Sequence, residues 1–121
     1  MSNVRAIRGA NQSLANTADA IAAATKELIR EILRANKLTP QDVISVIFTV
    51  SRDLDAAFPA SAARELGFEE VPLLCSVEIG VPGALERTIR LLAHVETNLA
   101  KSDITHIYLG AAKALRRDIA Q

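Results

Sequence analysis

The sequence predicts an α+β fold in which helices cover one face of a mixed β-sheet. Half of the 121 residues are hydrophobic but only 3% are aromatic, a composition typical of a compact domain with an aliphatic core. Apolar residues recur at spacings of three and four over residues 17 to 36, which indicates an amphipathic helix. A nearly continuous apolar, β-branched run at 43 to 50 is typical of a central strand covered on both sides.

The first half of the chain is predicted to alternate between strand and helix. Arg5 and Arg8 lie three residues apart in the first strand and therefore project from opposite faces. Gly9 lies near the end of this strand, where the backbone can turn or approach another group closely. Thr17 is the expected helix N-cap, and Pro40 suits the first position of a short turn. In order, we expect a strand at 3 to 10, a helix at 17 to 36, a turn at 39 to 42 and a strand at 43 to 50.

The second half is predicted to continue the same alternation. Pro59 begins a short helix, and Leu85, Ile89 and Leu92 lie on one stripe of a second long helix. We expect a polar loop at 51 to 55, a helix at 59 to 66, a strand at 71 to 79, a long helix at 84 to 97 and a strand within 102 to 109, with 111 to 115 as a candidate short strand. This order predicts one domain over residues 1 to 121, built on a single mixed sheet.

Charge and hydropathy exclude several classes of partner. Fourteen basic residues balance fourteen acidic ones, and the basic residues form no run, so neither nucleic-acid binding nor anionic-membrane binding is indicated. No apolar stretch approaches the roughly 18 to 20 residues that span a bilayer. Residues 1 to 12 do not resemble a signal peptide, and the single Cys75 leaves no internal disulfide. We therefore expect a cytoplasmic protein without nucleic-acid or membrane partners.

Sequence motifs of the common catalytic chemistries are absent. The chain has no G-x-G-x-x-G, P-loop, H-E-x-x-H or G-x-S-x-G motif. His94 and His106 have no further ligands at metal-binding spacing, and we interpret both as surface or core-edge side chains. Cys75 lies in an apolar strand, where a buried, inert thiol is the common case. No metal and no cofactor is therefore expected.

The arginines remain as candidates for binding and catalysis. They outnumber the lysines ten to four, which favours recognition of planar anions. Arg90 also has a structural explanation, because Glu86 lies one turn earlier in the predicted helix and could pair with it. Glu78 could likewise be an exposed acid at a strand end. Composition and periodicity alone therefore leave the function open. The arginines in question lie at the ends of predicted elements or on predicted helices: Arg8, Arg64, Arg90 and Arg116.

A more specific pattern appears when these arginines are taken together with their neighbours. The segments are, in chain order, Arg5-Ala-Ile-Arg8-Gly9-Ala10, Asp53-Leu54, Ala57-Phe58-Pro59-Ala60, Ala63-Arg64-Glu65-Leu66, Val71-Pro72, Cys75, Glu78, Gly83, Ile89-Arg90-x-Leu92, His106-x-Tyr108-Leu109, Leu115-Arg116 and Asp118. The set resembles the trimeric α/β-barrel-type chorismate mutases, which are distinct from the all-helical ones. The resemblance implies an isomerase that rearranges chorismate to prephenate in phenylalanine and tyrosine biosynthesis, with no metal or cofactor.

The resemblance also implies an assembly and a set of site residues. The assembly is a homotrimer whose sheets enclose a pseudo-α/β-barrel, with active sites between neighbouring subunits. Arg90 would stabilise the negative charge that develops on the ether oxygen, and Glu78 would accept a hydrogen bond from the ring hydroxyl. Arg8 and Tyr108 would hold the side-chain carboxylate. The other implied substrate-binding residues are Cys75 through its backbone, Phe58, Ala60 and Arg64 from the neighbouring subunit, and Leu115 and Arg116 near the C-terminus.

This sequence departs from the family pattern at three positions. Ser61 replaces a common lysine, Leu74 replaces a common threonine, and Arg117 follows Leu-Arg where a proline is frequent. Loss of the lysine predicts weaker attraction of a dianion and hence a higher KM. Strand alternation also places Cys75 and Glu78 on opposite faces, so their joint presence in a site requires a bulge or use of the Cys75 backbone.

Two alternatives stay open on the sequence. A trimeric imine or enamine deaminase would have a similar trimeric α+β architecture and an arginine that holds a carboxylate, although its own sequence pattern is not evident. A trimeric small-anion-binding or signalling protein would keep the arginines without catalysis. The presence of Glu78 together with Arg90 argues against the second alternative, because anion binding does not need a carboxylate beside the anion.

Overall fold

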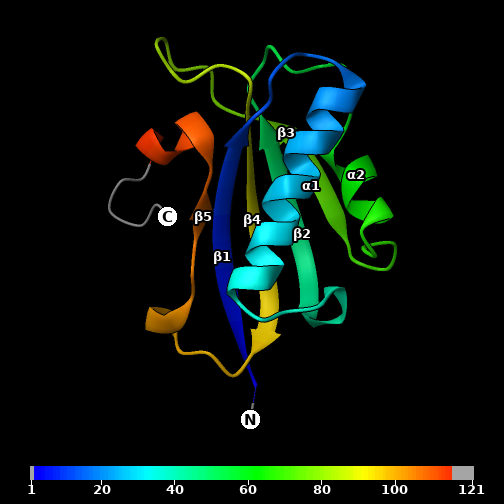
Figure 1. The fold of residues 1–121 in the computed structure, drawn as a ribbon, viewed down its shortest axis with the longest axis vertical. Helices are drawn as coiled ribbons and strands as arrows, with labels where there is room; N and C mark the ends of the chain where they lie inside the picture. Colours follow the sequence, from blue (N-terminus) through cyan, green and yellow to red (C-terminus); the bar gives the residue numbers. More distant parts are fainter. Residues whose placement is uncertain (1, 116–121) are drawn as a thin grey trace.

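The computed structural model describes residues 2 to 115, and within this range five strands form a single mixed sheet (Figure 1). The strands run in the spatial order β3-β2-β4-β1-β5. The central strand β4 is antiparallel to β1 and to β2, whereas β3 is parallel to β2 and β5 is parallel to β1. The strands are β1 (Asn3–Gln12), β2 (Val43–Val50), β3 (Leu73–Val77), β4 (Thr88–Thr97) and β5 (Ile107–Tyr108).

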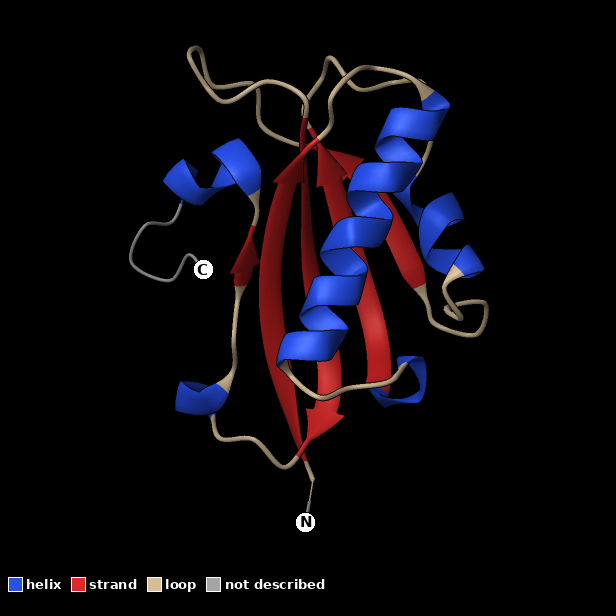
Figure 2. Ribbon diagram, in the orientation of Figure 1, coloured by secondary structure: helices blue, strands red, loops and turns tan. Residues whose placement is uncertain are grey.

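Two α-helices cover one face of this sheet (Figure 2). They are α1 (Ala18–Ala35) and α2 (Pro59–Glu65), and three short 3-10 helices complete the described range: η1 (Pro40–Asp42), η2 (Lys101–Asp103) and η3 (Gly110–Leu115). The α+β fold with helices on one face is therefore confirmed. The strand at 43 to 50 has the predicted bounds, and the first helix agrees with its prediction to within one residue at each end.

The core lies between the helix layer and the sheet. Leu28 and Ile32 of α1 pack with Ile7 of β1, while Phe48 of β2 and Leu91 of β4 complete the same buried cluster. Burying such a side chain contributes roughly 1.5 to 3 kcal/mol. The amphipathic stripe of α1 is thus matched by alternate residues of the strands.

Helix α1 begins and ends with the expected local chemistry. Thr17 is the N-cap, and its side chain accepts a hydrogen bond of 3.1 Å from the backbone N–H of Ala20. At the other end, the Asn36 amide donates to the carbonyl oxygens of Ile32 and Thr105, both at 2.9 Å. The second of these bonds ties the end of α1 to the segment that enters β5.

The prediction of a helix at 84 to 97 is wrong, because residues 88 to 97 form the central strand β4. Burial along this strand alternates, with Ile89 and Leu91 in the core and Arg90 and Leu92 on the opposite face. The strand at 111 to 115 is also wrong, since these residues lie in η3, and the strand within 102 to 109 is confined to β5. The strand at 71 to 79 shortens to β3.

The other face of the sheet carries no α-helix within residues 2 to 115 (Figure 2), and the 3-10 helix η3 covers it only beside Ala10 and Tyr108. Leu92 lies opposite Ile47 of β2 in the strand register, and Ile47 lies opposite Leu74 of β3. Leu74 is 62% exposed in the single chain, and Val4 near the start of β1 is also exposed. An uncovered apolar surface of this kind marks an interaction site more often than a solvated face. We call it the open face of the sheet.

Candidate active site

One cross-strand row brings the candidate catalytic residues to the open face. Arg90 of β4 lies opposite Thr49 of β2 on one side and opposite Ala10 of β1 on the other. The row extends to Ser76 of β3, opposite Thr49, and to Tyr108 of β5, opposite Ala10. Directly opposed residues of neighbouring strands project from the same face. The sheet register therefore sets Thr49 beside Arg90 and puts Tyr108 in the same row, with Ala10 between Arg90 and Tyr108.

Glu78 meets this row from just beyond the end of β3. Its backbone N–H donates to the carbonyl oxygen of Val50 at 2.9 Å, which extends the pairing of β3 with β2 by one residue. Its carboxylate oxygen Oε1 accepts a hydrogen bond of 2.8 Å from the Thr49 hydroxyl. The same oxygen lies 3.4 Å from Nε of Arg90, an ion-pair distance. Glu78 and Arg90 are thus held together by β2, which runs between them.

The Arg90 guanidinium retains unused donor capacity at this point. Its Nε is buried and makes no hydrogen bond within residues 2 to 115, although it lies in ion-pair range of Glu78. A buried donor without a hydrogen bond costs about 1 to 3 kcal/mol. Such a group is satisfied when an anionic or polar ligand enters beside it.

Two hollows adjoin the Glu78–Arg90 pair, and both residues line each of them. The first has a volume of about 350 Å³ and extends toward Arg52 and the loop that contains Gly80. The second has a volume of about 340 Å³ and extends across the open face to Arg8. The structure thus brings together three residues of the predicted site, Arg8, Glu78 and Arg90, in hollows of the size that small-molecule ligands occupy.

Tyr108 lies at the end of the same row but is covered. It is 3% exposed and packs with Ala10 and Ala112, and Leu85 and Leu115 contact this small cluster. The 3-10 helix η3 therefore brings Leu115 beside Tyr108. Arg116, predicted to close the site, lies outside the described residues.

Arg8 is anchored through its backbone by an imidazole. Its N–H donates to Nδ1 of His106 at 3.0 Å, one residue before the two backbone pairs that join β1 to β5. The Arg8 side chain is exposed on the open face. An exposed guanidinium on an anchored strand is well placed to receive a carboxylate from solvent.

Cys75 lies on the other side of the sheet from Glu78. It is opposite Phe48 in the register and packs against the core. The sulfur is therefore directed to the helix layer, as strand alternation predicts. Only the backbone of Cys75 is placed to serve a ligand on the open face.

The remaining predicted residues lie around α2 and line neither hollow. Phe58, the residue before α2, is 70% exposed, and Arg64 on α2 is also exposed. Ala60 is 5% exposed because its methyl group packs in the core. A single chain therefore does not bring Phe58, Ala60 or Arg64 to the Glu78–Arg90 pair.

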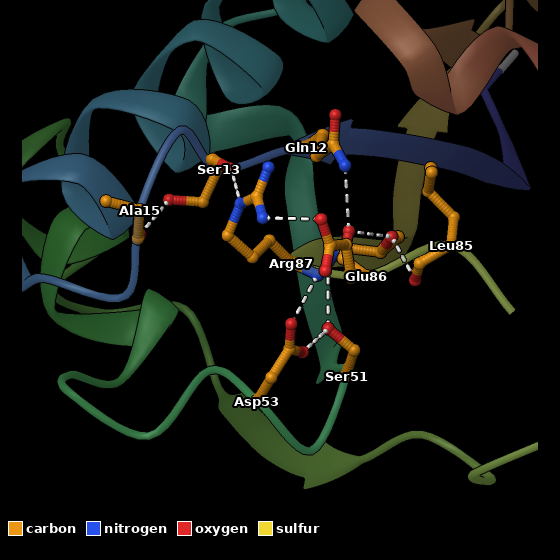
Figure 3. A network of polar contacts seen from close by, with 9 residues as sticks. Gln12, Ser13, Ala15, Ser51, Asp53, Leu85, Glu86 and Arg87 are labelled. Atoms are coloured by element: carbon orange, nitrogen blue, oxygen red, sulfur yellow. Dashed lines mark hydrogen bonds and ion pairs between the residues drawn. The ribbon is translucent and has the colours of Figure 1, made fainter.

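A polar network fixes the entry to β4 beside the first hollow (Figure 3). Arg87 has a positive φ of 48°, and its N–H donates to Asp53 Oδ2 at 2.9 Å. The Arg87 guanidinium donates to Ser13 O and to Glu86 Oε1 at 2.9 and 2.7 Å. The Ser51 hydroxyl donates to Asp53, which is the main reason that the pKa of Asp53 lies below its usual value. This network sets the register of β4 three residues before Arg90.

Three side chains at the site were not singled out by the sequence. Thr49 bonds to Glu78 and lines the second hollow, Arg52 lines the first, and Asp53, which the sequence offers only as part of the Asp53-Leu54 segment, lines the first as well. Thr49 could have been found, because it is one of two polar residues in the apolar run VISVIFTV. The suggested pairing of Arg90 with Glu86 is wrong, since Glu86 pairs with Arg87 and Arg90 pairs with Glu78.

The described residues offer neither a metal-binding cluster nor a membrane-spanning helix. Among residues 2 to 115 no group of three or more potential ligands could hold a metal ion. His94 instead contacts the Ser45 hydroxyl through Nδ1 at 3.3 Å. Neither of the two α-helices in this range is long and apolar enough to cross a bilayer.

Comparison with known proteins identifies the family. The sequence profile described as chorismate mutase type I matches residues 4 to 119. The chain is 45% identical over 117 residues to chorismate mutase AroH of Thermus thermophilus, with 96% of each chain covered. It is 37% identical over 118 residues to chorismate mutase AroH of Bacillus subtilis, with 97% of this chain and 93% of that protein covered.

A solved structure agrees with these relatives. A chorismate mutase from Clostridium thermocellum superimposes with a TM-score of 0.89 at 52% identity, covering 91% of this chain and 98% of that one. The agreement in sequence and in fold sets aside the deaminase and the non-catalytic anion-binding alternatives. The chain belongs to the chorismate mutase type I family.

Proposed function

We propose that the Glu78–Arg90 pair on the open face forms the catalytic centre in which this chorismate mutase converts chorismate to prephenate. The buried, unbonded Nε of Arg90 carries the proposal, because it provides a fixed cationic donor beside a carboxylate in a hollow that Arg8 also lines. A dicarboxylate ligand matches these charges. The protein needs no nucleophile, metal or cofactor for the reaction.

The reaction is a single pericyclic rearrangement of the bound substrate. The ether C–O bond breaks as a new C–C bond forms, and no atom is gained or lost. The enzyme must therefore select the compact conformer and stabilise the charge separation that develops in the transition state. Arg90 donates to the ether oxygen as it becomes negative, so its interaction is stronger in the transition state than in the ground state.

Glu78 acts on the ring of the substrate, where positive charge develops in the transition state. Its second carboxylate oxygen accepts a hydrogen bond from the ring hydroxyl, on the side where positive charge accumulates. The backbone at Cys75 assists, while the sulfur stays in the core. Arg8 and Tyr108 hold the side-chain carboxylate, and Leu115 and Arg116 close the site from the C-terminal end.

We propose further that the active enzyme is a homotrimer with sites between neighbouring subunits. Two observations support it: the open face is apolar and uncovered in the single chain, and Phe58 and Arg64 lie away from the hollows. A neighbouring subunit would bring Phe58 onto the substrate ring, with Ala60 and Arg64 beside it. Assembly would also bury Leu74 and Ile47. Each trimer would then contain three sites in a pseudo-α/β-barrel.

We place this enzyme in the cytoplasm, in the synthesis of phenylalanine and tyrosine. The single Cys75 is half-buried and unpaired, so the fold does not depend on an oxidising compartment. A soluble substrate dianion is the only small-molecule partner that the proposal requires.

Incubating the purified protein with chorismate and following loss of the diene absorbance tests the activity. We expect a rate far above that of buffer, and a strong loss in Glu78→Ala. A rate equal to buffer would overturn the proposed reaction. Full activity in Glu78→Ala would keep the reaction but remove the proposed catalytic centre.

Mixing two inactive variants tests the shared site. Arg64→Ala chains and Arg90→Ala chains should regain activity when mixed and allowed to exchange subunits, because hybrid trimers then contain some intact sites. If the mixture stays inactive after subunit exchange is confirmed, Arg64 and Arg90 belong to the site of one subunit. The control is a mixture of Arg90→Ala with Glu78→Ala, which should stay inactive because both residues come from the same subunit.

A further inference from the structure

We propose that Thr49 is a positioning residue for Glu78, an inference that rests on the proposed role of Glu78 in catalysis. The Thr49 hydroxyl holds one carboxylate oxygen of Glu78 so that the other oxygen faces the substrate. It also prevents the carboxylate from closing onto the Arg90 guanidinium. Thr49 also lines the second hollow, but its hydroxyl is already bonded to the Glu78 carboxylate, and in this account it acts through Glu78.

The sheet fixes Thr49 at the right place for this role. Thr49 is opposite Arg90 in the pairing of β2 with β4 and opposite Ser76 in the pairing of β2 with β3. Strand β2 therefore runs between the Arg90 guanidinium and the Glu78 carboxylate, the two groups that must be kept apart. The adjacent residue of β2, Val50, accepts the backbone N–H of Glu78 at 2.9 Å. Two consecutive residues of one strand therefore hold the backbone and the side chain of Glu78.

The contact distances decide which partner controls Oε1. Thr49 Oγ1 lies 2.8 Å from this oxygen, an ordinary distance for a hydroxyl bonded to a carboxylate, whereas Arg90 Nε lies 3.4 Å away and makes no hydrogen bond. The hydroxyl thus orients the carboxylate, and the guanidinium supplies only a more distant charge. Oε1 is occupied on the β2 side, and Oε2 keeps its lone pairs for a ligand.

Removing the hydroxyl changes the balance between the two charges. Arginine and carboxylate groups favour a bidentate pair with two parallel hydrogen bonds. Without Thr49 Oγ1, rotation of Glu78 toward Arg90 satisfies the buried Nε and neutralises the guanidinium. The ether oxygen then loses its cationic donor and the ring hydroxyl loses its acceptor. Both losses act on the transition state rather than on binding of the substrate carboxylates.

The test compares Thr49→Val, which keeps the branched shape and removes the hydroxyl, with Thr49→Ser, which keeps the hydroxyl. We expect kcat to fall roughly tenfold or more in Thr49→Val with little change in KM, and Thr49→Ser to recover most of it. A purely structural role would lower the amount of folded protein and leave the kcat of the folded fraction unchanged.

A matched control uses the other hydroxyl on the same face of β2. Ser45→Ala removes a hydroxyl that contacts His94 and lines neither hollow beside Glu78, so its kinetics should equal those of the parent. Thermal unfolding confirms that each variant is folded. Thr49→Ala serves as a second hydroxyl-free variant and should reproduce the kcat loss if Thr49→Val does not fold.

A double-mutant cycle separates failure of this inference from failure of the proposed site. In the Glu78→Ala background, Thr49→Val should have no further effect on kcat, because its only target is gone. If Glu78→Ala is inactive while Thr49→Val and Thr49→Ala both match the parent, the positioning role is overturned and the proposed site stands. If Thr49→Val still costs tenfold in the Glu78→Ala background, Thr49 acts by another route and the inference fails. If Glu78→Ala keeps full activity, the proposed site itself is wrong.

Discussion

Arg90 and Glu78 meet across strand β2, with Nε of one 3.4 Å from Oε1 of the other, although they belong to β4 and to the end of β3. Neither residue is close to the other in the chain, and no local pattern links them. The sheet order places them together, and the same order places Arg8 in the adjoining hollow. Activity is therefore expected to depend on charges held at fixed positions by the sheet.

Arg90→Ala should lower kcat/KM by an amount that corresponds to a loss of more than about 3 kcal/mol of transition-state stabilisation, because a charge that develops in the transition state loses its partner. Arg90→Lys should also fail badly, since an ammonium cannot serve two oxygens with the geometry of a guanidinium fork. Steady-state kinetics with chorismate measure both. Arg30→Ala is the matched control, because Arg30 is exposed on α1 on the far side of the sheet. Near-normal activity in Arg90→Lys would contradict the proposed role.

Arg52→Ala should raise KM several-fold with little change in kcat, because Arg52 adds positive charge to the hollow that Glu78 and Arg90 line. The guanidinium lies close over Gly80, where a Cβ would come within 3.0 Å of Arg52 Nε. Added salt should raise KM less in the variant than in the parent. An unchanged KM would show that Arg52 does not attract the substrate.

Leu74→Glu should dissociate the proposed homotrimer, because it places a charge on the apolar open face. Light scattering should give the parent a mass near three times the 13.0 kDa of the chain, and should give the variant a smaller mass and little activity. Leu14→Glu is the control, since Leu14 is 92% exposed and lies after β1, outside the sheet. A trimeric Leu74→Glu would mean that this face is not the subunit interface.

Asp53→Asn should lower stability near neutral pH and lose this effect in acid. The Ser51 hydroxyl, and to a lesser extent the Arg87 N–H, hold the pKa of Asp53 below its usual value. A carboxyl group with a lowered pKa in the folded state stabilises the protein above its unfolded-state pKa, about 4, and the contribution disappears as the pH falls through the folded-state value. Urea unfolding at about pH 7 and in stronger acid measures the difference. A gap that persists after Asp53 is protonated would contradict this account.

Gly9→Ala should destabilise the fold by about 1 to 3 kcal/mol, because its Cβ would lie 2.8 Å from Cδ1 of Ile32 and 3.0 Å from Cδ1 of Leu28. Ile32→Val removes the closest of these atoms and costs about 0.5 to 1.5 kcal/mol alone. The double variant should therefore be more stable than the sum of the two single effects predicts. Strict additivity in urea unfolding would exclude this clash as the cause.

Local sequence patterns predicted the first half of the fold but not the central strand. The helix at α1 and the strand β2 have strong periodicity and clear boundaries, including the Thr17 cap. The helix predicted at 84 to 97 rests on Leu85, Ile89 and Leu92, which recur at helical spacing, but in β4 the side chains of Ile89 and Leu92 lie on opposite faces of the strand. A strand that is apolar on both faces loses the alternation that distinguishes it from a helix. Its environment is set by β1 and β2, which are remote in sequence.

Some residues of the candidate site could be predicted from the sequence, and others could not. Arg8, Glu78 and Arg90 came from the resemblance, and the strand register explains why they lie together. The role of Thr49 is not predictable from its neighbours in the sequence, because it depends on the carboxylate of Glu78, 29 residues further along the chain. The position of Arg52 beside the hollow is not predictable either, because nothing in its local sequence distinguishes it from any other loop arginine. Contacts of this kind depend on sheet topology, which a pattern along the chain does not contain.

The alternation along β4 gives adjacent residues different selective constraints. Ile89 and Leu91 are constrained by the stability of one chain, whereas Arg90 and Leu92, on the function and assembly proposed above, are constrained by catalysis and by association with other chains. A saturation library of this strand, scored separately for the amount of folded protein and for turnover, should therefore show two sensitivity profiles that are out of phase by one residue. Evolution can tune the two properties almost independently within a single ten-residue segment.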